Sequence, residues 1–111
     1  MRGKEEANLI QKFKMEFLKR NPKAFWYKIP DYPGGPVRPF DAIVIACGSI
    51  FCLEFKAKTR ILRHQQYYMD WAERNGAISM VIEPAIYEQT MDAICALIEK
   101  SKEEECLKTM N

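Results

Sequence analysis

The chain has 111 residues, 48% of them hydrophobic and 29% charged, with a formal net charge of +2. These values are typical of one folded domain and exclude extensive disorder, and no apolar run approaches the roughly 20 residues that span a bilayer or resembles a signal peptide. We therefore expect a cytoplasmic single-domain protein over residues 1–111 with no membrane partner, its core at about residues 3–100 and an acidic tail at 101–111.

A first helix is predicted over residues 4–20, because Ile10, Phe13 and Phe17 and their apolar neighbours recur at spacings of three and four residues. At about 100° per residue, Glu6 falls in the same apolar stripe. An acid there is costly unless a charged or metallic partner meets it, which makes Glu6 a candidate site residue. The alternative is that Glu6 lies in the first helical turn, where free backbone N–H groups favour a carboxylate.

Asn21-Pro22 ends this helix, and residues 24–29 indicate a first strand. A loop rich in proline and glycine follows as far as Pro39. Residues 39–58 predict a hairpin, because β-branched and aromatic residues lie on both sides of a tight turn at Cys47-Gly48-Ser49. The hairpin supplies the second and third strands.

The hairpin carries three ionisable residues: Asp41 near the start of its first strand, and Glu54 and Lys56 in its second. Side chains alternate along a strand, so Glu54 and Lys56 share one face, and antiparallel pairing brings Asp41 near their level. The three then lie within reach of one divalent cation. The alternative is a half-exposed sheet whose wet face carries Glu54, Lys56 and Lys58 in cross-strand ion pairs.

A basic connection over residues 59–62 leads into a second helix, predicted over residues 63–75 and closed by Gly76. Gln65 shares a face of this helix with Met69, on the side expected to be buried. Gln65 is therefore expected near the end of the charged strand.

A fourth strand is predicted over residues 77–84 and a final amphipathic helix over residues 86–100. Residues 101–111 are acidic, and we expect them to fray. The order of the elements predicts an α/β fold with a mixed sheet, in which an antiparallel meander is followed by a helical crossover to a parallel strand.

The four cysteines, Cys47, Cys52, Cys95 and Cys106, show no C-x-x-C spacing, and His64 is the only histidine. A zinc site is not expected, because such sites use four Cys or His ligands with short paired spacings. Cys47 and Cys52 could face each other across the hairpin, although free thiols are the expected state in a reducing compartment.

The ordered motifs resemble the PD-(D/E)xK nuclease superfamily. They are a glutamate on the opening helix, Pro39-Phe40-Asp41 at the start of a strand, Glu54-Phe55-Lys56 on the next strand and a glutamine opening the following helix. The likeness runs roughly from Gly3 to Pro84 and is nearest to small members similar to Holliday-junction resolvases and to virus-type replication-repair (VRR-NUC) nucleases. The resemblance implies a restriction-endonuclease-like α-β-β-β-α-β core with a mixed sheet flanked by helices.

The resemblance also implies a metal site. Asp41 and Glu54 would bind Mg²⁺ or Mn²⁺ together with the backbone carbonyl of Phe55, and Glu6 would complete the site directly or through water. Hydrolysis of a phosphodiester builds negative charge on the phosphate, and hard cations held by carboxylate oxygens neutralise that charge.

The remaining catalytic roles are implied in the same way. Lys56 would orient or deprotonate the attacking water, and Gln65 would contact the water or the lysine. Gln66 is the alternative to Gln65, which we prefer for its facing and for its distance from Gly76.

The charge distribution suits a partner that carries phosphates. Residues 1–75 contain 14 Lys and Arg against 8 Asp and Glu, a balance of +6, whereas residues 76–111 contain 3 against 7, a balance of −4. Solvated helix faces can produce the same pattern. The candidate phosphate contacts are Lys4, Lys12, Arg38, Lys58, Arg60 and Arg63.

These inferences lead to the hypothesis of a metal-dependent DNA endonuclease, with branched Holliday junctions among its candidate substrates. Because a small chain covers little of a duplex and junction resolution needs paired incisions, we expect a homodimer. The compact form would suit a phage or a mobile element. Two alternatives stay open: a non-catalytic nucleic-acid-binding module with a nuclease-like fold, and a structural α/β domain whose charged strand is only a wet face.

Overall fold

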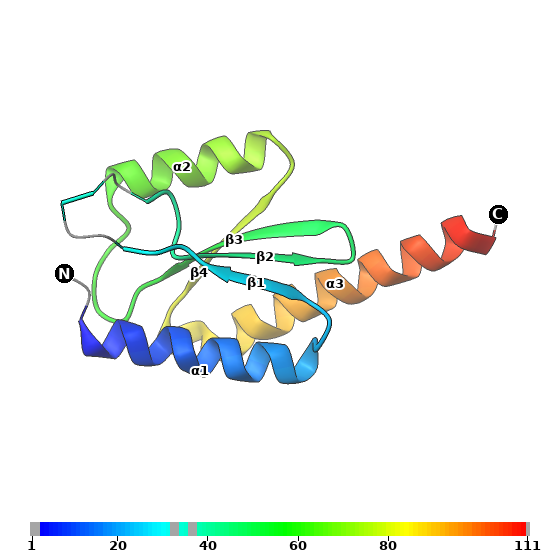
Figure 1. Ribbon diagram of the computed structural model, residues 1–111, viewed down its shortest axis with the longest axis horizontal. Coiled ribbons are helices and arrows are strands. Elements are labelled where there is room, and N and C mark those ends of the chain that lie inside the picture. The colour runs from blue at the N-terminus through cyan, green and yellow to red at the C-terminus, as the bar shows by residue number, and fades with distance from the viewer. Residues whose placement is uncertain (1–2, 32–33, 36–37, 111) are drawn as a thin grey trace.

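The computed structural model describes residues 3–31, 34–35 and 38–110, with side chains described as far as Glu104. One four-stranded sheet lies between α2 on one side and α1 and α3 on the other (Figure 1). The elements are α1 (Lys4–Arg20), β1 (Phe25–Lys28), β2 (Ala42–Ala46), β3 (Ser49–Phe55), α2 (Arg63–Arg74), β4 (Ile78–Ile82), a 3-10 helix (Pro84–Ile86) and α3 (Tyr87–Met110).

The strands are ordered β1-β2-β3-β4 across the sheet. The pairs β1–β2 and β2–β3 are antiparallel, whereas β3 and β4 are parallel and joined through α2. A parallel neighbour requires such a crossover, because a short turn can only reverse the chain. The predicted α-β-β-β-α-β core and its mixed sheet are therefore confirmed.

The tight turn between β2 and β3 consists of Cys47 and Gly48. Their φ angles are 50° and 82°, and the flanking residues Ala46 and Ser49 are paired. Two consecutive positive φ values match the right-handed twist of the flanking strands and favour glycine. This turn fixes the register of the hairpin, and therefore which residues of β2 and β3 lie opposite one another.

The main core lies between the sheet and the pair α1 and α3. Leu9, Ile10, Phe13 and Phe17, whose spacing indicated the first helix, are all buried in it, and Phe13 is completely buried. The Phe13 ring lies 5.5 Å from the Phe55 ring and 5.8 Å from the Tyr87 ring, both in edge-to-face geometry. Aromatic pairs of this kind add specific geometry to apolar burial. They fix α1 against β3 and α3.

A smaller cluster occupies the other side of the sheet, under α2. Phe40, Cys52 and Met69 are its buried members, with Tyr68 and Val81 packed against them. Met69 confirms that the predicted inward face of the second helix is the buried one. Residues of β3 therefore alternate between the two clusters, with Leu53 and Phe55 facing α1 and α3 and Cys52 facing α2.

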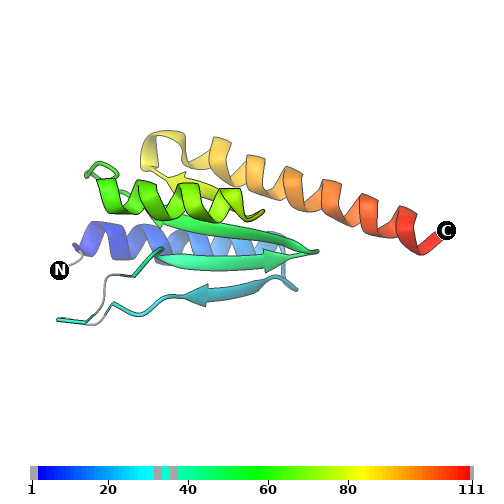
Figure 2. The ribbon, with the colours of Figure 1, turned by 90° about the horizontal axis from the view of Figure 1, so that it is seen from above.

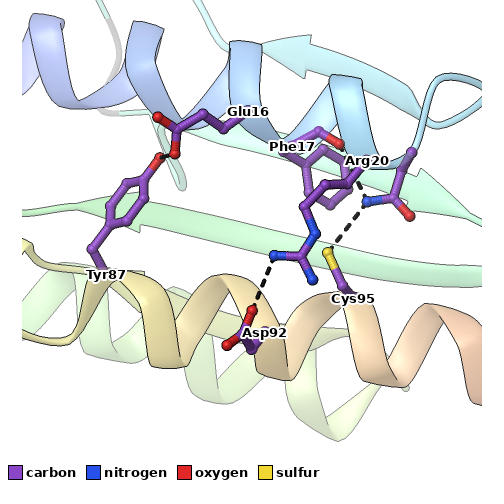
Figure 3. Close-up of polar contacts among 7 residues, drawn as sticks. Glu16, Phe17, Arg20, Tyr87, Asp92 and Cys95 are labelled. Carbon is purple, nitrogen blue, oxygen red and sulfur yellow. Dashed lines mark hydrogen bonds and ion pairs between the residues drawn. The ribbon is translucent and has the colours of Figure 1, made fainter.

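Polar contacts join α1 to α3 along their length (Figure 3). The Tyr87 hydroxyl donates to a Glu16 carboxylate oxygen at 2.8 Å, and Arg20 pairs with Asp92 at 3.0 Å. At the end of α1, Asn21 Nδ2 donates to Cys95 Sγ at 3.3 Å. These contacts fix the long axis of α1, and hence the position of its amino-terminal turn.

Cys47, Cys52 and Cys95 are free cysteines, and the side chain of Cys106 lies outside the described ones. Cys47 is exposed in the hairpin turn, whereas Cys52 is buried under α2. Burial raises the pKa of the Cys52 thiol, because a thiolate is poorly solvated there. Cys47 and Cys52 are not joined, as the prediction of free thiols requires.

The expectation that residues 101–111 fray is wrong for the described residues, because α3 continues to Met110 and projects beyond the sheet (Figure 1). This segment contains no glycine or proline, and Glu, Lys, Leu and Met favour helix. Asn111 lies outside the described residues. None of the described helices combines the length and the apolarity needed to cross a membrane.

Candidate active site

Two acidic residues meet where β2 begins and β3 ends. Asp41 lies one residue before β2, and its backbone N–H donates to the Leu53 carbonyl at 3.0 Å. The paired register ends with Ala42 and Leu53, so Asp41 and Glu54 are the next residues beyond it on their two chain segments. Glu54 alternates with Leu53 and Phe55 and so has the facing of Cys52, toward α2. Phe40 and Ala42, on either side of Asp41, pack in different clusters, so the alternation is interrupted at Asp41. Asp41 and Glu54 are each only 2% exposed.

Asp41 is held by a backbone hydrogen bond and by an ion pair. The Phe55 N–H donates to Asp41 Oδ2 at 2.8 Å, and Arg38 Nη2 lies 2.7 Å from Asp41 Oδ1. Arg38 also donates through Nη1 to the Ile29 carbonyl at 2.9 Å, and its Nη2 lies 3.8 Å from Asp31 Oδ2. The orientation of the buried carboxylate is thus fixed by β3 and by the loop that carries Arg38.

Lys56 continues the same face of the strand as Glu54. It is 8% exposed, and its backbone N–H donates to the Ile82 carbonyl at 3.0 Å, which fixes it beside the end of β4. A buried lysine and a buried glutamate two residues apart differ from the solvated, cross-strand ion pairs of a wet strand face. The wet-face interpretation therefore does not account for Glu54 or Lys56, although Lys58 is exposed.

A groove of about 350 Å³ lies between the amino-terminal turn of α1 and the segment that follows β3. Glu6 and Lys56 both line it, and Glu6 accepts a hydrogen bond from Thr59 Oγ1 at 3.1 Å. The charged residues of its lining are Glu5, Glu6, Lys56, Lys58 and Arg60, three positive against two negative. The groove therefore has a small positive excess at the end of β3.

Glu6 lines this groove, and its part in a metal site stays a prediction. Within the described part of the chain, no three Asp, Glu, His or Cys side chains gather closely enough to hold a metal ion. The helix α1 covers the Phe55 face of the sheet, whereas Glu54 has the facing of Cys52. Glu6 comes from α1 and lines the groove at the end of β3 together with Lys56.

No family model matches this chain, and no curated protein matches it. Among solved structures, a protein described as "VRR_NUC domain" superposes on it with a TM-score of 0.62. The chain has a VRR_NUC-type fold. The superposition covers 83% of this chain and 96% of the other, at 22% sequence identity.

In this VRR_NUC-type fold, the predicted glutamine lies at the start of α2. The side-chain oxygen of Gln65 accepts the Leu62 N–H at 2.9 Å, which satisfies a donor that the helix leaves without an intrahelical partner. Gln66 is exposed, and its amide donates to Asp70 at 2.8 Å. Gln65 thus shapes the segment next to the groove, and its part in chemistry stays a prediction.

The predicted phosphate contacts are distributed unequally around the VRR_NUC-type fold. Lys58 and Arg60 line the groove, and Lys58 pairs with Glu5 at 3.1 Å. Lys12 lies 4.5 Å from the centre of the Tyr87 ring, at the contact of α1 with α3. Lys4 and Arg63 are exposed.

Arg38 does not lie at the surface where a phosphate contact was expected. Its side chain is 12% exposed and is engaged by Asp41 and by the Ile29 carbonyl. The sequence contains a signal for this role that our prediction missed, because Arg38 precedes Asp41 by three residues across Pro39-Phe40 in a turn. Thr59 was also missed, since a threonine in a basic connection carries no distinctive pattern.

Proposed function

We propose that this protein is a divalent-metal-dependent endonuclease that hydrolyses DNA phosphodiester bonds. The observation that carries the proposal is the buried pair Asp41 and Glu54, followed on the same strand face by buried Lys56, in a nuclease-like fold. Burying three ionisable groups at one end of a sheet is costly to stability, and such groups are characteristic of functional sites.

The donor atoms suit a hard ion such as Mg²⁺ or Mn²⁺. Asp41 and Glu54 would supply carboxylate oxygens, and Phe55, whose N–H donates to Asp41, would supply its backbone carbonyl. When bound, the ion would neutralise phosphate charge and acidify water. The Arg38 guanidinium already balances Asp41, so the ion would have to compete with it.

Lys56 would stabilise the negative charge that develops on the phosphate or orient the attacking water. Lys56 is buried at the end of β3 and lines the groove, which places it between the acidic residues and the proposed entry path. Glu6 would act from the groove, through water, because it comes from the other side of the sheet. Gln65 would orient the segment that carries Lys58 and Arg60.

DNA would approach along the groove, with Lys58 and Arg60 contacting phosphates. We further propose branched DNA, including four-way junctions, as the substrate and a homodimer as the active form, since paired incisions need two copies of the site.

A second function is favoured by one observation. The 2.7 Å pair between Arg38 and Asp41 holds a would-be metal ligand in an internal ion pair. A nuclease-like module that binds nucleic acid without cutting it would keep such a pair permanently. In that protein, salt-dependent DNA binding would be unchanged by Glu54→Gln and by a chelator.

The experiment that tests the proposal is a cleavage assay on linear, flapped and four-way DNA with Mg²⁺ or Mn²⁺. We expect Asp41→Asn and Lys56→Met to lower the rate by about 100-fold or more. Lys58→Met is the matched control, because it removes another lysine of the groove and should cost less than about tenfold. A wild-type protein inert on every substrate with both metals, or a Lys56→Met variant as active as the wild type, would refute the proposal.

A further inference from the structure

The exposed apolar side chains are concentrated on one side of the molecule. Nine large hydrophobic residues are exposed in the described part of the chain, and six of them belong to the side of the sheet on which α2 lies. We call this surface the open face, and its exposed members are Phe25, Tyr27, Ile45, Ile50, Tyr67 and Trp71.

The strand residues of the open face share one face because of their register. Phe25 pairs with Ile45, and Ile45 pairs with Ile50, so the three lie opposite one another across β1, β2 and β3. Tyr27 is two residues from Phe25 and so has the same facing. None of these four positions carries a charge.

The helix α2 leaves this part of the sheet uncovered. It packs chiefly on β4, and β1 and β2 extend beyond it when the molecule is viewed from the α2 side (Figure 2). By contrast, the other side of the sheet is covered by both α1 and α3 (Figure 1). The open face is therefore a layer of side chains without the second layer that a sheet normally has.

Aromatic residues of α2 border the uncovered strands. The Tyr68 and Trp71 rings stack at 6.3 Å, and Tyr67 lies 5.9 Å from Trp71. A recess of about 390 Å³ lies beside them, lined by Pro39, Phe40, Tyr68, Trp71, Ala72 and Asn75. The open face thus combines a strand surface, a raised helix edge and an apolar recess next to that edge.

We propose that the open face is the interface with a second copy of this chain in a two-fold dimer. The six side chains, each 41% to 55% exposed, present roughly 500–600 Å². A partner in a standard-sized interface contributes about 800 Å², more than half of it apolar, so this patch supplies the apolar part of such an interface. The inference rests on the homodimer that is part of the proposed function and assigns its interface.

A second copy fits this surface better than DNA does. In a two-fold dimer the same patch meets itself, so an uncharged strand surface avoids the repulsion that identical charges would cause. A DNA-binding surface needs Lys and Arg to neutralise phosphates. The basic residues Lys58 and Arg60 line the groove and are not part of the open face. No residue of the groove belongs to the open face.

The test is the mass of the protein in solution, without DNA or metal, measured by sedimentation over a range of concentrations. We expect a dimer for the wild type and self-association at least about tenfold weaker for Ile45→Lys and for Ile50→Lys. Ile86→Lys is the matched control, because Ile86 is 43% exposed and Ile45 is 41% exposed, but Ile86 lies outside the open face. Far-ultraviolet circular dichroism verifies that each variant is folded.

A wild-type protein that stays monomeric at all concentrations, or an Ile86→Lys variant as impaired as Ile45→Lys, would overturn the inference. Unchanged mass with weakened DNA binding in Ile45→Lys would also overturn it, and would assign the open face to nucleic acid. Because the mass is measured without cleavage, an inactive but dimeric wild type would refute only the proposed nuclease.

Discussion

Arg38 and Asp41 form a buried ion pair at the position where the proposed metal would bind. The pair is 2.7 Å long, and the Asp41 residue is 2% exposed. Removing one partner of a buried pair leaves an uncompensated charge in a poorly solvated place. A substitution of either residue at the site is therefore expected to change the stability of the fold as well.

Replacing Arg38 is expected to destabilise the fold markedly. We expect Arg38→Ala to lower the free energy of unfolding by about 3 kcal/mol, measured by urea denaturation. Arg20→Ala is the control, because it also breaks an Arg–Asp pair, of 3.0 Å, whose side chains are 45% and 67% exposed. Exposed pairs contribute about 0–1 kcal/mol, so equal losses in the two variants would contradict a structural role for Arg38.

Some positions of the site residues could be predicted from the sequence and others could not. Strand alternation alone predicts that Glu54 and Lys56 share one face, and the hairpin turn fixes a register that ends at Ala42 and Leu53, next to Asp41 and Glu54. The position of α1, which carries Glu6, was not predictable in this way, because helical periodicity fixes which side of α1 is apolar but not which face of the sheet the helix covers. That choice depends on tertiary packing.

At the scale of elements, Tyr87 joins α3 to α1. Tyr87 is buried, and its hydroxyl donates to Glu16, while Lys12 lies over its ring. Burial first, and then the hydrogen bond to Glu16, raise the pKa of Tyr87. A raised pKa in the folded state means that this contribution to stability is complete below the ordinary tyrosine pKa of about 10 and is lost as the pH rises above it.

The Tyr87→Phe variant tests this contact. We expect it to lower the free energy of unfolding by about 1 kcal/mol at neutral pH, because the hydrogen bond to Glu16 is lost. Above about pH 10 the wild type should lose stability that the variant does not lose, so the difference between them should shrink. A difference that stays constant from neutral to strongly alkaline pH, measured by urea denaturation, would contradict this account.

The carboxyl-terminal end of α3 is expected to contribute little to the stability of the domain. Ser101 joins α3 to the sheet through its hydroxyl, which lies 2.8 Å from the Ser49 hydroxyl. Truncation after Lys102 should therefore change the free energy of unfolding by less than about 0.5 kcal/mol, while circular dichroism shows less helix. A loss above about 2 kcal/mol would show that the projecting helix stabilises the domain or its assembly.

At the scale of the whole molecule, hydrophobic periodicity was sufficient to predict the order of elements and the mixed sheet. The apolar spacing in α1, the alternation in β3 and the glycine turn at Gly48 all act locally, and so they are readable from the sequence. The uncovered strands of the open face were not predicted. Exposure on one side of β1 and β2 depends on how far α2 reaches across the sheet, which no local pattern encodes.

The central claim is that Asp41 and Glu54 form a binding site for a hard divalent ion. A Mn²⁺ titration, followed by electron paramagnetic resonance of the free ion, tests it without reference to activity. We expect saturable binding by the wild type, weakened about tenfold or more by Asp41→Asn and unchanged by Asp31→Asn, which alters the exposed carboxylate near Arg38. A wild type that binds no Mn²⁺, or an Asp41→Asn variant that binds it equally well, would contradict the account.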